Sequence, residues 1–527
     1  MENVFKVEKA NWKERVLLSL TMGAMFILYF FHWKFCLPLH PNVDENITIR
    51  IVQQMLDGNG VLFRVFNYPH LAFYWGGLWC KIVSLFSHSV DIVLVLRIVE
   101  CGFALLSNIG IYFSIKELTG SKNWAYAGLL IALCSLYQAQ YLYYAGPDVM
   151  LYGVANITLY LGVKIYKEED IQKVFHKWYP LMAVSIGLAM SAKYHGILFG
   201  FYWLMIHIVK KYAKSIQYNI RFALSCFFIV VTWLICNISL FFYMNDFFFG
   251  IFGISDNYLK NNTPPLVHSC PLLGYLEVFF LHNFGVFGIL FSLFGIVYLL
   301  KEKNYRKLAF AILAMIILVF LILGNLNLML GRNLSLIMPF SYLFITFGLY
   351  ALGQQFAQLR IRVISITLLL LIMVGINIGA IIVSERYDES YQTAEGWIEH
   401  NIPENSTIYL KGGSYVPRID ENKYRVEFLD TKDLPDHLEA NEYFIAVEYY
   451  ESRWIQKKDY PFIFGDEYVK PDWAEMYLNK ISKYTEIVSF PGITYEHGWR
   501  YRIGYFDIFK YNKNDYYIGP TIEIFAR

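Results

Sequence analysis

Residues 361–383 read IRVISITLLLLIMVGINIGAIIV, an apolar run that carries one charged residue, Arg362. A helix of about 20 apolar residues crosses the roughly 30 Å hydrocarbon core of a bilayer. This run is long enough to do so, and it is the last of its kind, because from residue 384 onward charges recur every few positions. The change in polarity predicts a membrane region, 1–383, followed by a water-soluble domain, 384–527.

Similar runs occupy most of the chain before this boundary. The sequence is 56% hydrophobic and 17% charged, whereas soluble domains are about a quarter charged. We therefore expect a polytopic α-helical membrane protein with about eleven transmembrane helices. The first run is too long for a signal peptide and lacks a cleavage site, so it should be retained. The candidates lie near 16–37, 94–115, 123–144, 149–165, 179–199, 197–209, 222–243, 284–300, 307–323, 334–353 and 361–383.

Lys and Arg are unevenly distributed among the loops between these runs. Cytoplasmic loops carry an excess of these residues. Every basic cluster falls on one side if the ambiguous apolar stretch 71–87 does not cross the membrane, so we expect that stretch to be an interfacial or re-entrant helix. The N-terminus is then cytoplasmic and the domain 384–527 extracytoplasmic. The clusters lie at 6–15, 116–122, 164–177, 210–221, 301–307 and 360–362.

The soluble domain mixes helical and strand-like patterns, which predicts an α+β fold. Its first segment, 391–400, has a helical pattern that ends before Pro403, and short β-like runs follow. The seven cysteines all lie upstream and have no disulfide-framework or zinc spacing. A net charge of +2 gives no argument for a nucleic-acid partner. The expected strands lie at 406–410, 443–449, 485–490 and 502–510.

Asp44 and Glu45 follow the first apolar run at the predicted outer surface. They open a stretch in which Ile47, Ile51 and Met55 recur at helical spacing. Asp before a helix is commonly an N-cap, which is the simplest interpretation of Asp44. Adjacent residues do not share a helix face, so one carboxylate can face a substrate while the other orients it.

The run 44–82, DENITIRIVQQMLDGNGVLFRVFNYPHLAFYWGGLWCKI, resembles the first outer loop of the protein O-mannosyltransferase and aminoarabinose transferase superfamily, which is glycosyltransferase family 39-like. In that family Asp-Glu opens a juxtamembrane helix, and a Tyr-Pro-Pro-Leu-type motif follows. Further resemblances occur in the expected order, at Asp148 after Ala-Gly-Pro, at Lys193 before Tyr-His-Gly, and at Arg332 before Pro339. The resemblance implies the GT-C fold and catalysis of glycosyl transfer.

The same comparison suggests Arg50, Tyr68 and His70 as further substrate-binding residues. Arg50 is the nearest arginine after Asp-Glu, where the aminoarabinose enzymes carry one closer. Tyr68 stands in place of a charged residue, and His70 in place of the second Pro. The Tyr expected after Arg332 is replaced by Asn333. These departures leave the metal requirement and the donor preference open.

The chemistry of such a transfer suggests roles for the matching residues. Nucleotide sugars are cytoplasmic, so transfer at the outer face requires a sugar on a polyprenyl phosphate. The leaving phosphate needs cations, which Lys193 and Arg332 would supply. Asp44 is the candidate base for the acceptor, Glu45 orients, and Asp148 organises the acceptor or a cation. Direct displacement with one base implies inversion at the anomeric carbon.

Each of these residues also has a simpler interpretation. Lys193 can extend to the interface as a lipid-facing lysine, Arg332 can pair with Asp148, and Asp148 can cap a helix. His70, His195, His268 and His282 are candidates for a divalent metal site, although an isolated interfacial histidine usually binds no metal.

Several alternatives for the whole chain also remain open. They are a transporter or lipid flippase, and a catalytically inactive relative that acts as a sensor or assembly subunit. The sequon at Asn46 would place a glycan beside Asp44 in a eukaryotic secretory pathway, which favours a bacterial plasma membrane. The acceptor is a protein, a lipid or a cell-envelope glycan, and membrane lipids are the remaining expected partners.

Overall fold

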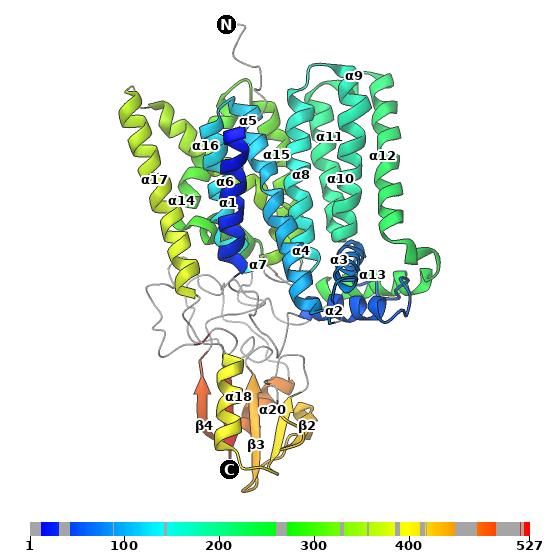
Figure 1. Cartoon of the computed structure of the whole chain (residues 1–527), viewed down its shortest axis with the longest axis vertical. Helices are drawn as coiled ribbons and strands as arrows, with labels where there is room; N and C mark the ends of the chain where they lie inside the picture. The colour runs from blue at the N-terminus through cyan, green and yellow to red at the C-terminus, as the bar shows by residue number, and fades with distance from the viewer. Residues whose placement is uncertain are drawn as a thin grey trace.

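The computed structural model places a bundle of long helices above a small mixed sheet (Figure 1). Among the described residues, five helical stretches are long and apolar enough to cross a membrane. They indicate an integral membrane protein, as expected, while the predicted count of about eleven spans stays a prediction. These stretches are Ile92–Thr119, Pro147–Lys167, Ile216–Cys236, Asn283–Lys301 and Arg306–Gly324. The structure describes residues 12–30, 43–87, 89–141, 145–259, 271–326, 331–355, 358–384, 390–411, 417, 419–447, 472–491, 517 and 521–527.

The bundle helices follow the predicted apolar runs, with several breaks inside those runs. A single run from 94 to 115 becomes two helices joined at Asn108, and the run 123–144 is broken after Leu133. The bundle helices are α1 (Trp12–Phe30), α4 (Ile92–Ser107), α5 (Ile109–Thr119), α6 (Lys122–Leu133), α7 (Leu136–Tyr141), α8 (Pro147–Lys167), α10 (Tyr179–Ala192), α11 (Phe199–Val209), α12 (Ile216–Cys236), α14 (Pro271–Lys301), α15 (Arg306–Gly324), α16 (Met338–Gln355) and α17 (Leu359–Ser384).

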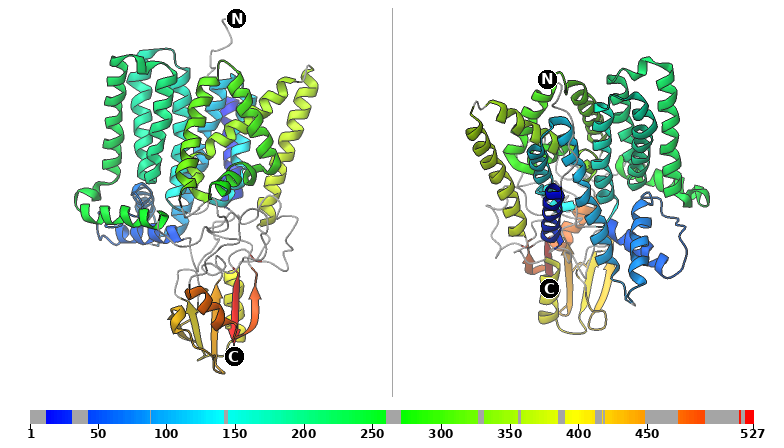
Figure 2. Two further views of the ribbon diagram at one scale, coloured as in Figure 1. Left: turned by 180° about the vertical axis from the view of Figure 1, so that it is seen from behind. Right: turned by 45° about the horizontal axis from the view of Figure 1, so that its top comes forward.

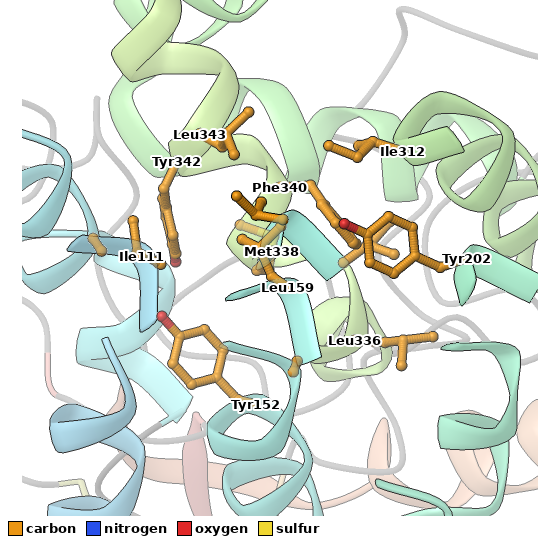
Figure 3. Packing of buried hydrophobic residues seen from close by; sticks show 14 of the residues in the cluster. Ile111, Tyr152, Leu159, Tyr202, Ile312, Leu336, Met338, Phe340, Tyr342 and Leu343 are labelled. Atoms are coloured by element: carbon orange, nitrogen blue, oxygen red, sulfur yellow. The ribbon is translucent and has the colours of Figure 1, made fainter. Parts of the chain in front are cut away.

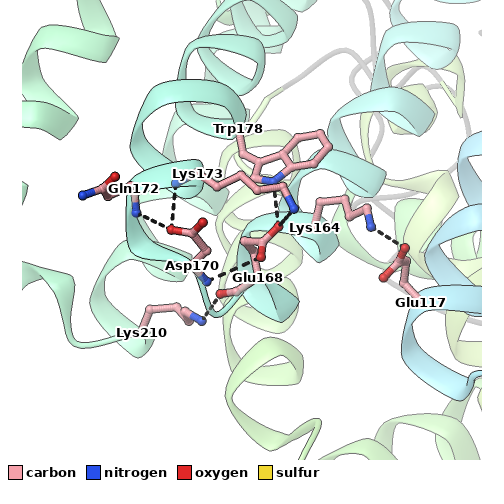
Figure 4. A network of polar contacts seen from close by, with 8 residues as sticks. All are labelled: Glu117, Lys164, Glu168, Asp170, Gln172, Lys173, Trp178 and Lys210. Atoms are coloured by element: carbon pink, nitrogen blue, oxygen red, sulfur yellow. Dashed lines mark hydrogen bonds and ion pairs between the residues drawn. The ribbon is translucent and has the colours of Figure 1, made fainter. Parts of the chain in front are cut away.

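Several of the predicted basic clusters meet at one end of the bundle. Lys116 pairs with Glu14 (Nζ to Oε1 2.5 Å), and Tyr305 donates from its hydroxyl to the Leu118 carbonyl oxygen at 3.0 Å. This end carries α9 (Ile171–Lys173) in Figure 1. Its assignment to the cytoplasm stays a prediction. Figure 4 shows the polar network there, which joins Glu117, Lys164, Glu168, Asp170, Gln172, Lys173, Trp178 and Lys210.

Three short helices cover the opposite end of the bundle: α2 (Val43–Leu56), α3 (Leu71–Ser84) and α13 (Met244–Leu259). They lie across the bundle, on the same side as the sheet, in Figure 1 and from behind in Figure 2. With 14 residues, α3 is too short to span a bilayer, in agreement with the predicted interfacial stretch. The loop between α2 and α3 also touches α13, because the Phe66 and Phe247 rings lie 5.6 Å apart between centroids.

The bundle core is filled by aromatic and branched side chains from α5, α8, α11, α15 and α16 (Figure 3). Helices α14 and α16 approach very closely at two glycines. A Cβ on Gly295 would lie 1.9 Å from the Phe344 carbonyl oxygen, and one on Gly348 would lie 2.0 Å from that of Phe291. Small residues allow such contact between helices in membranes, where packing rather than water exclusion drives association.

The C-terminal part forms a five-stranded sheet in the order β2-β1-β3-β5-β4. Strand β1 is parallel to β2 and β3, whereas β5 is antiparallel to β3 and β4. Helix α18 packs on the face that carries Ile408 and Ile445, and α20 on the face that carries Phe444. The elements are α18 (Ser390–Asn401), β1 (Thr407–Lys411), β2 (Arg425–Leu429), β3 (Glu442–Val447), α20 (Asp472–Ile481), β4 (Thr485–Phe490) and β5 (Ile522–Ala526).

Helix α18 and strands β1, β3 and β4 match predicted elements within the described residues, whereas β2, α20 and β5 were not predicted. The strand expected at 502–510 lies outside the described residues. The predicted domain boundary at 383/384 falls at the end of α17 and stays a prediction.

Candidate functional site

The candidate site begins at the first turn of α8. Pro147 opens this helix, where its fixed φ and missing N–H carry no penalty. Asp148 follows within the first turn, where the helix dipole favours a negative charge. The sequence Gly-Pro-Asp therefore presents a carboxylate at the end of the bundle that carries α2 and α3.

Lys193 reaches Asp148 from a break between two helices. Helix α10 ends at Ala192, and Lys193 has extended backbone (φ −152°, ψ 135°) before a 3-10 turn begins. The predicted apolar segment 179–199 therefore ends several residues early. The Lys193 Nζ donates to Asp148 Oδ1 at 2.7 Å and to Asn333 Oδ1 at 3.0 Å. The break at Lys193 therefore places its ammonium group against oxygens from two other elements.

Arg332 joins the same group from a third element, the 3-10 turn Gly331–Leu336. Its Nε lies 3.6 Å from Asp148 Oδ2. The Lys193, Asp148 and Arg332 side chains are only 9%, 10% and 11% exposed. Three residues that the sequence placed far apart, and that we expected at one membrane face, therefore form one buried ionic cluster.

Neighbouring polar residues support this cluster. Asn333, the departure from the expected Tyr, accepts from Lys193 and donates through Nδ2 to the Tyr275 hydroxyl at 3.3 Å. The Tyr137 hydroxyl donates to the Arg332 carbonyl oxygen at 3.1 Å. The Tyr137 backbone N–H in turn donates to Asn283 Oδ1 at 3.3 Å, next to the kink in α14. The position of Arg332 is thus tied to the α7 and α14 backbones.

A buried ion pair, Glu45 with Arg97, lies beside this ionic cluster. Glu45 of α2 accepts two hydrogen bonds of 2.7 Å from Arg97 of α4, through Nε and Nη2. Both side chains are at most 1% exposed. Glu45 Oε1 also accepts the Ala145 backbone N–H at 3.0 Å. Asp44 is the second residue of α2, and its side chain lies outside the described part of the structure.

Arg97 and Glu100, both in α4, were not predicted as site residues. Glu100 is fully buried, and its Oε2 accepts the Gly146 backbone N–H at 2.5 Å. The available signal was the presence of two charged residues inside the apolar run 94–115, because charges in such runs almost always face the protein interior and a partner. The Glu45–Arg97 pair and the ionic cluster are connected through residues 145–148. Glu45 and Glu100 bind the backbone N–H groups of Ala145 and Gly146, just before Asp148.

The remaining predicted residues lie in and around the loop between α2 and α3. Arg50 is exposed on α2, and Tyr68 is half-buried. His70 is fully buried, with its ring 4.9 Å from that of Phe66 and its Nε2 2.9 Å from the Val65 carbonyl oxygen. Burial lowers the pKa of His70 to about 4, and the hydrogen bond to Val65 opposes this shift only in part. His70 is therefore neutral near pH 7 and packs against Phe66 in this loop. Substrate binding by Arg50, Tyr68 and His70 stays a prediction.

The described residues gather no group of three or more His, Cys, Asp or Glu side chains suited to a metal ion. His70 uses one ring nitrogen for Val65, and His195 is not grouped with other ligands. His268 and the side chain of His282 lie outside the described residues. A divalent metal ion as cofactor stays a prediction.

The chain matches no curated protein sequence. Residues 81–235 match the family model of dolichyl-phosphate-mannose-protein mannosyltransferases. This confirms the predicted resemblance over a segment that contains Arg97, Asp148 and Lys193, whereas Glu45 and Arg332 lie outside it.

Two solved structures resemble the chain in fold. One is ArnT from Cupriavidus metallidurans bound to undecaprenyl phosphate, with a TM-score of 0.50 and 14% identity over 64% of this chain and 62% of that one. The other is the Archaeoglobus fulgidus oligosaccharyltransferase tethered with an acceptor peptide, with a TM-score of 0.51 and 14% identity over 90% of this chain and 73% of that one. The bundle therefore has the GT-C fold of membrane glycosyltransferases, and the chain spans about 62% of the length of ArnT.

Proposed function

Since residues 81–235 match the mannosyltransferase family and the bundle shares the fold of GT-C enzymes, we propose that this chain is an inverting glycosyltransferase. It moves a sugar from a polyprenyl-phosphate donor to an acceptor hydroxyl or amine at the outer face of a membrane. The acceptor belongs to a protein, a lipid or a cell-envelope glycan, and the C-terminal domain contributes to its selection.

The observation that carries the proposal is the ionic cluster of Asp148, Lys193 and Arg332. It gathers a lysine and an arginine at a buried position, at the end of the bundle covered by α2. Arginine binds phosphate oxygens in a bidentate manner and lysine acts as a point charge. In a water-poor site such cations stabilise charge that develops on a leaving group far more than they would in water.

This arrangement supports the following reaction. The acceptor oxygen or nitrogen attacks the anomeric carbon while the bond from that carbon to the phosphate oxygen breaks. The electron pair of that bond stays on the phosphate, which leaves as a polyprenyl phosphate beside Lys193 and Arg332. Asp44, at the start of α2, accepts the proton of the acceptor. Glu45 is held by Arg97, so its role in this proposal is to anchor this end of α2.

A donor assay with purified protein tests this function. The protein would be incubated with radiolabelled polyprenyl-phosphate sugars and a native membrane extract as acceptor. We expect the wild type to release polyprenyl phosphate from one donor, and Asp44→Asn to reduce this rate by at least about 100-fold, since a general base contributes that much or more.

Asp57→Asn is the matched control, because Asp57 is an exposed carboxylate just beyond the other end of α2 and its Oδ1 accepts a hydrogen bond from Gln53 one turn earlier. It should retain wild-type turnover. Full activity of the Asp44→Asn variant would remove Asp44 as the base. No turnover of any donor by folded wild-type protein would favour a transporter, or an inactive relative that acts as a sensor.

A further inference from the structure

Glu100 is a buried carboxyl group within a membrane helix, and the reaction above gives it no role. It lies three residues after Arg97, so the two side chains project from the same face of α4. Arg97 binds Glu45 of α2, and Glu100 accepts the Gly146 N–H at 2.5 Å. One face of α4 therefore holds both α2 and the segment that leads into α8.

The carboxyl groups of Glu45 and Glu100 accept hydrogen bonds from consecutive peptide groups. Glu45 accepts the N–H of Ala145 at 3.0 Å, and Glu100 accepts the N–H of the next residue, Gly146. Pro147 follows and has no N–H, so the backbone donors directly before Asp148 are all accounted for by these two side chains. The entry to α8 is fixed by partners from two other helices rather than by its own capping side chain.

A carboxyl group at this position is costly unless it makes a specific interaction. Glu100 is 0% exposed, and the apolar side chains of Leu96 and Cys80, which belong to one cluster beside it, are fully buried as well. Helix α3 packs tightly on the same face, because a Cβ on Gly76 would lie 2.1 Å from Leu96 Cδ2 and 3.6 Å from Glu100 Oε1. Apolar residues would fill this space at lower cost, since an ionisable group within a membrane segment carries a large desolvation penalty.

We propose that Glu100 is a positioning residue, which fixes the turn 145–148 so that Asp148 and its two cations stay aligned with α2. The inference rests on the proposed function, because alignment matters only if Asp44 and the phosphate-binding cations act on one donor. Glu100 touches no substrate and acts through the Gly146 peptide group. Misplacement of a reacting group by about 1 Å can reduce a rate about 100-fold, so one hydrogen bond at this turn has a measurable effect.

Two substitutions separate the acceptor role from packing. Glu100→Gln keeps an oxygen that can accept the Gly146 N–H, whereas Glu100→Met keeps the length of the side chain and removes the acceptor. Cys101→Ala is the control for disturbance of a neighbouring buried position on α4. For each variant, kcat and KM for the donor would be measured, together with hydrogen–deuterium exchange of the peptide that covers 145–150 in detergent.

We expect Glu100→Met to lower kcat about 10- to 100-fold with a smaller change in KM, and to speed exchange at 145–150. Glu100→Gln and Cys101→Ala should stay within about threefold of the wild type in kcat, because neither removes the acceptor at this turn. Wild-type kcat in Glu100→Met would overturn the proposal, as would equal damage in Glu100→Gln. If the wild type turns over no donor, the proposed function fails, and exchange alone then decides whether Glu100 holds the turn.

Discussion

Among single residues, burial determines how much the Glu45–Arg97 pair contributes to stability. Both side chains are at most 1% exposed, so removal of one partner leaves an uncompensated charge in the interior. We expect Arg97→Met to destabilise the protein by about 3–5 kcal/mol. The double variant Glu45→Met/Arg97→Met should regain much of this loss but not the transferase activity, because α2 is no longer held in place. Thermal unfolding of each variant in detergent, together with the donor assay, measures both quantities.

Arg64→Met provides the matched control for that prediction. The Arg64 side chain is 74% exposed, and its Nε lies 3.9 Å from Asp246 Oδ2. Such an exposed pair contributes no more than about 1 kcal/mol. Equal stability of Arg97→Met and Arg64→Met would show that the buried pair adds nothing to the fold.

The position of a charged residue relative to an apolar run explains which site residues were predicted from the sequence. Asp148 and Arg332 stand just before apolar runs, and Lys193 stands near the end of one within a motif that resembles the family, and the structure brings them together. Arg97 and Glu100 stand inside a run, and an apolar pattern does not tell which face of a helix meets lipid and which meets protein. The pairing of Arg332 with Asp148 is real, and it is compatible with phosphate binding because a carboxylate can hold two cations in place.

Among the elements, the kink of α14 is the clearest case of backbone conformation that supports the site. Gly285 has φ 56° and ψ −141°, a region that is essentially restricted to glycine. Asn283, two residues earlier, accepts from the Ser135 hydroxyl at 2.5 Å and from the Tyr137 N–H. We expect Gly285→Ala to destabilise the bundle by about 1–3 kcal/mol and to slow transfer, since the kink supports Tyr137 and through it Arg332.

Gly375→Ala in α17 is the control for this prediction, because its Cβ would meet nothing within 4 Å. Because alanine favours a helix interior more than glycine does, this substitution should be neutral or should stabilise the protein by up to about 1 kcal/mol. Melting temperatures and donor turnover of the two variants provide the comparison. If Gly285→Ala matched Gly375→Ala in both, the kink would not constrain the site.

The elements that the sequence predicted are those with strong local patterns. Long apolar runs give the bundle helices, and the segment 391–400 matches α18. Strand β2 was missed although RVEF alternates polar and apolar residues, because the run is short. Its side chains are half-buried or exposed, so the strand contributes little to the core. The break at Lys193 was also missed, because its extended backbone is favoured by contacts with Asp148 and Asn333, which are distant in sequence.

At the scale of the whole molecule, the sheet and the candidate site lie at the same end of the bundle. The polar network around Glu117 and Lys164 lies at the other end (Figures 1 and 4). Because cytoplasmic loops are rich in Lys and Arg, the site and the sheet should both face the outside. This orientation determines the donor class, since a site facing the cytoplasm would have nucleotide sugars available.

Cysteine labelling tests this orientation. Lys483→Cys places a thiol after α20, and Lys303→Cys places one in the loop after α14, both at exposed positions. We expect a membrane-impermeant maleimide to label position 483 but not 303 in intact cells or spheroplasts, and both after permeabilisation. The wild type measures background from the native cysteines. Labelling of 303 alone would reverse the orientation, and the donor would then have to be sought among nucleotide sugars instead of polyprenyl phosphates.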